Sequence, residues 1–351
     1  MSAVPPLLVG KRRRLAALLA LLALGEALLA VLFAAALDRV LASANASLIP
    51  LLVAGGCAAM LAVSMLLARW VGENFAQDFV ADCRAAIFAK VTRQTTVDPA
   101  AASRDARWLT VLLNDMAALR NYALRGTVRL WTSVLAGGAA AGWIALTMPL
   151  LRPALLPLLL AASGIIVLLW PLTQAITAQR RARGKINRFL IRRVRAELAG
   201  AVSPKGHGFR KLTTLSGELS DASVRRARQA GVMDAIATFA GLAAALAAVW
   251  EAHNTAAGRA GIAGALTLLG FVAARLLEAA RALHARAGGR IALVRLAQLL
   301  DPEPKNIARF ALHTWAAGWK QKAAAVLGSS GQTPRLPAPV HPTATSQEPS
   351  K

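Results

Sequence analysis

The stretch of sequence that decides the fold runs from residue 48 to residue 91 and reads LIPLLVAGGCAAMLAVSMLLARWVGENFAQDFVADCRAAIFAKV. Its first part, 48–68, meets the requirement of a transmembrane helix, which needs about 20 mostly apolar residues. In its second part, apolar residues recur at every fourth position, the spacing of one helix face: Phe75, Phe79, Cys83, Ile87 and Val91. No separate helix start stands between the two parts. We therefore predict one continuous helix of about 66 Å at 1.5 Å per residue.

The composition of the whole chain is typical of a membrane protein. Its 351 residues are 56% hydrophobic, with a mean hydropathy of +0.49, and carry 41 Lys and Arg against 17 Asp and Glu. A soluble domain is about 45–50% apolar. The two cysteines, Cys57 and Cys83, exclude a disulfide scaffold and a zinc site made mainly of thiolates. The large apolar fraction excludes disorder for most of the chain.

Five further apolar stretches accompany 48–68, which predicts six membrane-spanning helices. The six stretches are 15–37, 48–68, 130–148, 153–172, 232–250 and 261–277. The first is too long for the apolar core of a signal peptide, which is about 7–15 residues, so we expect an uncleaved helix there.

The number of basic residues alternates between high and low from one gap between the predicted spans to the next. The N-terminus, the two long gaps (69–129 and 173–231) and the C-terminal part hold 38 of the 41 basic residues. The three short gaps hold one each: Arg39, Arg152 and Arg259. Because Lys and Arg concentrate on the cytoplasmic side of membrane proteins, we expect a multi-pass protein of the plasma (inner) membrane with both termini in the cytoplasm.

Both long gaps have the periodicity of helices. In the first, apolar residues continue from Leu109 to Leu124 at roughly helical spacing, after a break at 95–105 that contains Asp98 and Pro99. In the second, two apolar stripes flank a break at 200–208. The sequence therefore predicts two long helical hairpins, each ending in a short tip.

Four short stretches, in this order, add a family likeness: RAAIFAKV (84–91), NDMAALR (114–120), AELAG (196–200) and LAQLLDPE (296–303). Together with the six spans, they resemble the transmembrane domain of ATP-binding-cassette (ABC) exporters over residues 15–303. The resemblance implies an all-α membrane protein with six transmembrane helices and two long cytoplasmic extensions, which follow helices two and four. The sequence departs from the family pattern in both tips: 100–104 holds no glycine, and the second tip holds Pro204, Gly206 and Gly208.

The sequence holds no nucleotide-binding motif of this family. The phosphate-cradling loop G-x-x-x-x-G-K-[ST] is absent, and the stretch 328–333 is similar only superficially. We therefore expect no ATP hydrolysis by this chain alone. The resemblance implies that ATP and Mg²⁺ bind only to a separate nucleotide-binding ATPase subunit, and that a second transmembrane subunit completes a homo- or heterodimer.

The two ends of the chain differ from its middle. Residues 1–14 form a basic N-terminus that we expect in the cytoplasm. Residues 304–327 fit either a basic amphipathic helix, which lies on anionic lipid or docks a partner, or a partly ordered extension. Residues 328–351 are rich in Pro, Ser, Thr and Gly, which predicts disorder.

The candidate site residues fall into two groups. By the resemblance, the tips would touch the ATPase partner through Asp98, Arg104, Asp105, Lys205, His207 and Arg210; the alternative is solvated turn residues. Within or beside the spans stand the polar residues Glu26, Arg275 and Glu278.

Glu26 lies in the first predicted span, where a carboxylate is costly and often faces a cavity or carries protons. The alternative is a hydrogen-bonded or protonated residue inside the bundle. Arg275, Glu278 and Arg281 have the spacing of an ion-pair ladder on a helix. Asp234 is expected to start a helix at the mouth of the fifth span.

The basic run at 180–195 is adjacent to a membrane span and contains an apolar stripe. These neighbours favour anionic lipid or a partner over nucleic acid. The histidines have no metal-binding spacing, and no catalytic set is recognisable. Beside an exporter subunit, two alternatives remain open: a motor-less membrane anchor or regulatory or assembly module, and a truncated longer transporter. A membrane-embedded enzyme is disfavoured.

Overall fold

The computed structural model describes residues 4–42, 48–93, 116–198, 205–254 and 261–300, which are almost entirely helical and contain no strand within these ranges. The elements in chain order are α1 (Lys11–Ala42), α2 (Leu48–Arg93), α4 (Met116–Asn121), the π-helix η2 (Tyr122–Val128), α5 (Arg129–Thr147), the 3₁₀-helix η3 (Pro149–Leu155), α6 (Leu156–Leu198), α7 (Lys205–Asn254) and α8 (Ile262–Leu300). Because α4, η2 and α5 follow one another without a gap, they serve as one spanning unit.

The structure confirms the six predicted apolar spans. It contains six helical segments that are long and apolar enough to cross a membrane, and each holds one of the predicted stretches. These segments indicate a multi-pass membrane protein. The single helix predicted over 48–91 is α2, which has 46 residues and no interruption between its apolar and amphipathic parts.

The second long gap is more helical than predicted. The expected break covered 200–208, but α7 already begins at Lys205, so Gly206 and Gly208 lie within its first turns. Asp234 lies well inside this 50-residue helix, so the expected helix start at the fifth span is wrong. Because the amphipathic stripe and the fifth span belong to one continuous helix, no helix end occurs at Asp234 that a side chain would have to cap.

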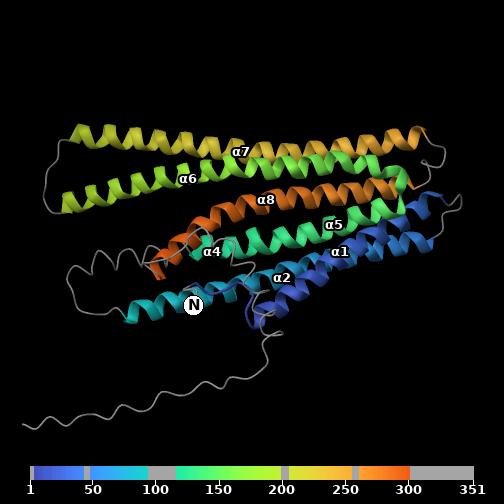
Figure 1. Cartoon of the computed structure of the whole chain (residues 1–351), viewed down its shortest axis with the longest axis horizontal. Helices are drawn as coiled ribbons and strands as arrows, with labels where there is room; N and C mark the ends of the chain where they lie inside the picture. The colour runs from blue at the N-terminus through green and yellow to red at the C-terminus, as the bar shows by residue number, and fades with distance from the viewer. Residues whose placement is uncertain (1–3, 43–47, 94–115, 199–204, 255–260, 301–351) are drawn as a thin grey trace, which may run out of the picture. The chain divides into compact units, whose positions relative to one another are not determined.

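Three pairs of neighbouring helices dominate the packing: α6 with α7, α1 with α2, and α5 with α8. The helix α8 also contacts α7, α1, η2 and α6, so it lies at the centre of the arrangement (Figure 1). The long ends of α2, α6 and α7 point in the same direction, toward the left of Figure 1. We call this side the long-helix end and the opposite side the short-loop end.

Small residues fill the contacts between the apolar parts of the helices. One core cluster contains eight buried alanines, from α1, α5, η3, α6 and α7, beside buried Leu268 and Leu269 of α8. In lipid, association of helices depends on van der Waals packing, which small side chains favour because they let backbones approach. The abundance of alanine therefore has a structural use in this bundle.

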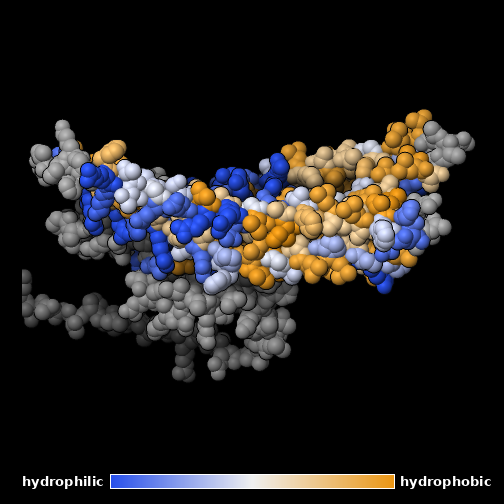
Figure 2. Space-filling view, turned by 90° about the horizontal axis from the view of Figure 1, so that it is seen from above, coloured by the Kyte–Doolittle hydropathy of each residue, from blue (hydrophilic) through white to orange (hydrophobic). Residues whose placement is uncertain are grey.

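Large apolar side chains cover the outside of the spans. Leu146 is 81% exposed and Val167 is 73% exposed, together with many others on α1, α2, α6 and α7. Figure 2 shows hydrophobic residues toward the short-loop end of one face and hydrophilic residues toward the long-helix end. This distribution fits a protein whose spans face lipid and whose helical extensions face water.

The first residues of α1 are fastened to the extension of α2. Arg12, in the basic N-terminus that the sequence predicted for the cytoplasm, is only 2% exposed. Its guanidinium forms an ion pair with Asp82 at 2.5 Å, lies 3.6 Å from Asp78, and stands 5.7 Å from the ring centroid of Phe79. The amphipathic stripe of α2 is thus buried partly by the chain's own N-terminal segment, in which Val4 and Leu7 are also buried.

Several expectations lie outside the described residues. These are the first tip with its stripe up to Leu113, the proposed amphipathic helix 304–327 and the tail 328–351. All described helices belong to one compact unit, Met1–Ile307.

Candidate functional site: an arginine-lined cavity

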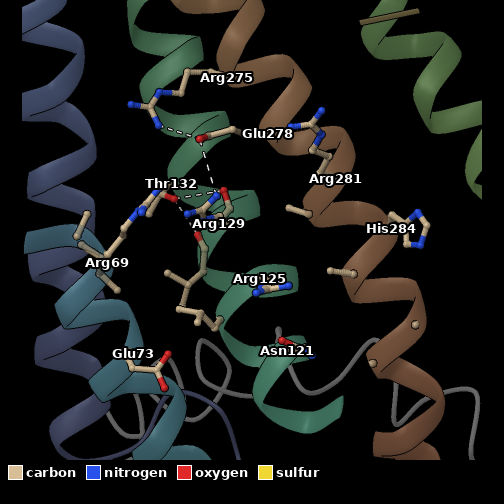
Figure 3. Close-up of a pocket in the computed structure, with 18 of the residues that line it drawn as sticks. Arg69, Glu73, Asn121, Arg125, Arg129, Thr132, Arg275, Glu278, Arg281 and His284 are labelled. Atoms are coloured by element: carbon tan, nitrogen blue, oxygen red, sulfur yellow. Dashed lines mark hydrogen bonds and ion pairs between the residues drawn. The ribbon is translucent and has the colours of Figure 1, made fainter. Parts of the chain in front are cut away.

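A cavity with a volume of about 900 Å³ lies between α1, α2, the α4–η2–α5 unit and α8. Seven arginines and three glutamates line it, and we call it the arginine cavity. Its charged lining residues are Arg69, Arg125, Arg129, Arg180, Arg226, Arg275, Arg281, Glu26, Glu73 and Glu278. Figure 3 shows most of these side chains projecting from three sides into the same space.

The cavity lies where the apolar spans end and the polar extensions begin. Arg69 is the first charged residue after the apolar stretch of α2, and Arg129 immediately precedes the apolar stretch of α5. Arg275 lies near the end of the sixth apolar stretch. Apolar side chains, among them Met65, contribute much of the remaining lining, beside the polar residues Asn121, Thr132 and His284. The cavity therefore combines charged and apolar walls, as ligand pockets usually do.

A buried ion cluster joins α1 to α8 at one side of the cavity. Arg275 donates to a carboxylate oxygen of Glu26 at 2.5 Å and to Glu278 at 2.9 Å. The hydroxyl of Ser133 donates to the same Glu278 oxygen at 3.2 Å, and Arg129 lies 3.9 Å from the other oxygen. The side chains of Glu26 and Arg275 are 6% and 10% exposed. Within this cluster both carboxylates are compensated by arginine.

The π-helix η2 presents two of the cavity's arginines. It carries Arg125, and Arg129 follows directly after its end. A π-helix adds a residue to the helical turn and so changes the direction of the side chains that follow; such turns are frequent at functional sites. The sequence NYALRGTV contains no feature from which we predicted this local geometry.

Glycines hold η2 unusually close to α8. A Cβ atom added at Gly126 would lie 2.7 Å from the Cα atom of Arg286, and one added at Gly289 would clash with Tyr122. Two glycines, one on η2 and one on α8, therefore allow the two backbones to pack closely beside the cavity. The close contact fixes the position of η2, and with it the origin of Arg125.

The rim of the cavity contains three further polar contacts. Glu73 accepts two hydrogen bonds of 2.7 Å from Arg120, which does not line the cavity. Arg226 donates to Gln179 at 2.8 Å and lies 2.8 Å from the His284 ring nitrogen Nε2. Each of these contacts joins two different helices, so the rim is built from long-range pairs.

The residues predicted for the spans are brought together, but in a different pairing. Glu26, Arg275 and Glu278 form one cluster, although no sequence pattern linked Glu26 to α8. The predicted ladder stops at Glu278, because Arg281 instead pairs with Asp234 of α7 at 3.2 Å. A helix position alone does not determine which neighbouring helix supplies the partner.

The six tip residues are not brought together by the described structure. Asp98, Arg104 and Asp105 lie outside the described residues. Lys205, His207 and Arg210 fall in the first turns of α7, where Arg210 is exposed. Their role in contacting a partner stays a prediction.

The sequence reasoning missed the arginines that gather in the cavity from different helices. Arg69, Arg125 and Arg129 had been counted only as part of the charge of a long gap. The positions of Arg69 and Arg129 next to the ends of apolar stretches are the signal that could have identified these two. Within the described part of the chain, no group of three or more His, Cys, Asp and Glu side chains is placed to hold a metal ion. The excess of arginine over glutamate in the lining suits the cavity to binding anions.

No protein-family model matches this chain, and no curated protein is significantly similar to it.

Proposed function

We propose that this chain is the transmembrane, or permease, subunit of an ABC-type exporter. It would move a substrate across the plasma (inner) membrane, with ATP hydrolysis supplied by a separate nucleotide-binding subunit. A second transmembrane subunit, identical or different, would complete the translocation path. The two long-helix tips would receive the movement of the ATPase partner.

The observation that carries the proposal is the position of the long helices in the chain. The second span continues into an extension within the 46-residue α2, and the fourth and fifth continue within α6 and α7, of 43 and 50 residues. These extensions point the same way (Figure 1). An exporter subunit needs such an arrangement, because a motor outside the bilayer can act on the spans only through rigid elements.

The mechanism that follows is a rigid-body movement. At 1.5 Å per residue, α7 is about 75 Å long, roughly two and a half times the hydrocarbon thickness. A displacement of its far end by the ATPase partner would tilt its apolar part against α8. Such a tilt would shift the ion pairs between these two helices, such as that of Arg281 with Asp234.

The decisive experiment is purification of the full chain from its native membrane, followed by a search for an associated P-loop ATPase and measurement of ATP hydrolysis. The proposal expects a stoichiometric ATPase subunit whose activity requires this chain. Charge reversal at the start of α7, Lys205→Glu with Arg210→Glu, should weaken the association. The matched control is Arg225→Glu with Arg228→Glu, two exposed positions farther along the same helix.

A chain that purifies from its native membrane without any ATPase would refute the exporter role and favour the motor-less anchor or assembly module. Orientation supplies an independent test. Single cysteines at Ala100 and Lys205 should resist an impermeant maleimide added outside the cell, whereas one at Arg152 should react. Labelling at 100 or 205 would place the extensions on the wrong side for the proposal.

A further inference from the structure

The charges inside the arginine cavity do not balance. Its lining includes four more arginines than glutamates. Of the three carboxylates, Glu26 and Glu278 belong to the cluster around Arg275, and Glu73 is held through both oxygens by Arg120 from outside the lining. Each of the three carboxylates in the lining is therefore already paired with an arginine.

Two of the arginines form no direct bond to another side chain within the described ranges; Arg125 interacts with Glu73 only by Coulomb attraction beyond ion-pair distance. No hydrogen bond or ion pair of Arg69 or of Arg125 occurs there, whereas Arg281 pairs with Asp234 and Arg226 with Gln179. Figure 3 shows both side chains within the space enclosed by α2, η2 and α8. They start from different helices, α2 and η2, so they can reach one ligand from two sides.

The physical chemistry of these groups selects the ligand class. A guanidinium is always charged and presents a planar fork of donors, which matches the oxygens of phosphate or carboxylate in pairs. Two uncommitted guanidiniums together with the excess of positive charge favour a group with at least two negative charges. Placement at the end of the apolar spans, with Met65, Leu124 and Val128 in the wall, also accommodates an apolar chain attached to that group.

We propose that the arginine cavity binds a phosphate group with two negative charges, which Arg69 and Arg125 hold from opposite sides. The phosphate is either the headgroup of an anionic lipid or part of a free water-soluble anion. Both sources present the same oxygens to the two arginines. They differ in whether an acyl chain occupies the apolar wall of the cavity.

The test uses the purified full chain in nanodiscs of phosphatidylcholine. Isothermal titration with dihexanoyl phosphatidic acid represents the lipid source, and titration with inorganic phosphate represents the free anion. Dihexanoyl phosphatidylcholine, which carries the same chains and no net charge, is the ligand control. The variants are Arg69→Gln, Arg125→Gln and the double substitution, and Arg225→Gln with Arg228→Gln is the matched control.

We expect the unmodified chain to bind phosphatidic acid, inorganic phosphate or both, and not to bind phosphatidylcholine. A charged hydrogen bond contributes about 1.5–3 kcal/mol, so each single variant should raise Kd by about tenfold or more, and the α7 control should leave it unchanged. Binding of phosphatidic acid alone identifies the lipid source, and binding of both with similar Kd identifies the free anion.

Absence of binding by both phosphates would overturn the proposal, as would unchanged affinity in the two single variants. Arg69 and Arg125 are exposed, so each single substitution leaves the core intact and can be measured if the double variant fails to fold. The titration requires neither an ATPase subunit nor transport. The exporter proposal can therefore fail while the phosphate site holds, and the converse is equally distinguishable.

Discussion

Removal of Arg275 from the buried Glu26–Arg275 pair should destabilise the bundle more than replacement of both residues by apolar ones. In Arg275→Met, the Glu26 carboxylate loses its 2.5 Å partner while only 6% of its side chain is exposed. Breaking a buried pair in this way costs about 3–5 kcal/mol, because an uncompensated charge stays inside.

The opposite single variant should cost less. In Glu26→Leu, Arg275 keeps its 2.9 Å bond to Glu278 and its position 4.8 Å from the ring centroid of Phe271. We expect a loss of about 1–3 kcal/mol, typical of a lost hydrogen bond to a charged group. The double variant, which leaves neither charge of the pair, should lose about 3 kcal/mol or less.

A double-mutant cycle measures this difference. The free energy of unfolding of the four proteins is obtained by titration with SDS in mixed detergent micelles, followed by circular dichroism. We expect a coupling energy of at least about 1 kcal/mol between positions 26 and 275, since residues in one ion network are not additive. Additivity within about 0.5 kcal/mol would refute the argument that this pair closes α1 onto α8.

Three further outcomes follow from other contacts. Gly126→Ala should destabilise the protein by about 1–3 kcal/mol in the same unfolding assay, because its Cβ would press on the backbone of α8, whereas Gly138→Ala meets no atom within 4 Å and should not. Asp38→Ala should cost about 1 kcal/mol because its carboxylate accepts a 2.7 Å bond from a backbone N–H in the first turn of α8, and Asp38→Asn, which keeps an acceptor, should cost less; equal losses would contradict this. Cys57 and Cys83, 8% and 0% exposed, should react with a bulky maleimide only after denaturation, and reaction of the folded protein, detected by mass spectrometry, would show that the interior opens.

Hydrophobic patterning predicted the helices well because each span carries its own signal. The run of apolar residues at 48–68 and the following stripe of Phe75, Phe79, Cys83 and Ile87 determine α2 without any information from the rest of the chain. The structure buries all four stripe residues to 2% exposure or less. Local composition is sufficient where a helix must satisfy its own backbone hydrogen bonds in lipid.

The candidate site was only partly predictable because its contacts join distant parts of the chain. Glu26 was identified as an unusual residue, but its partner Arg275 is 249 positions away and on another helix. Arg125 carries no local signature beyond its charge. The reorientation of side chains by η2 also depends on packing of Gly126 against α8, which a single sequence does not reveal.

The ion pairs of Arg12 with the extension of α2 also bear on how the protein is made. Residues 4–93 contain a helix pair, the N-terminal segment that rests on it and the charges that fasten the two, so this unit can close before the ribosome has produced α4. The neighbours α6 and α7 form a second unit of the same kind. By contrast, α8 contacts α1, α5 and α7 and is the last of the described helices in chain order. We therefore expect a nascent chain that stops before Ile262 to contain the helix pairs α1–α2 and α6–α7 without α8, the helix that contacts both pairs.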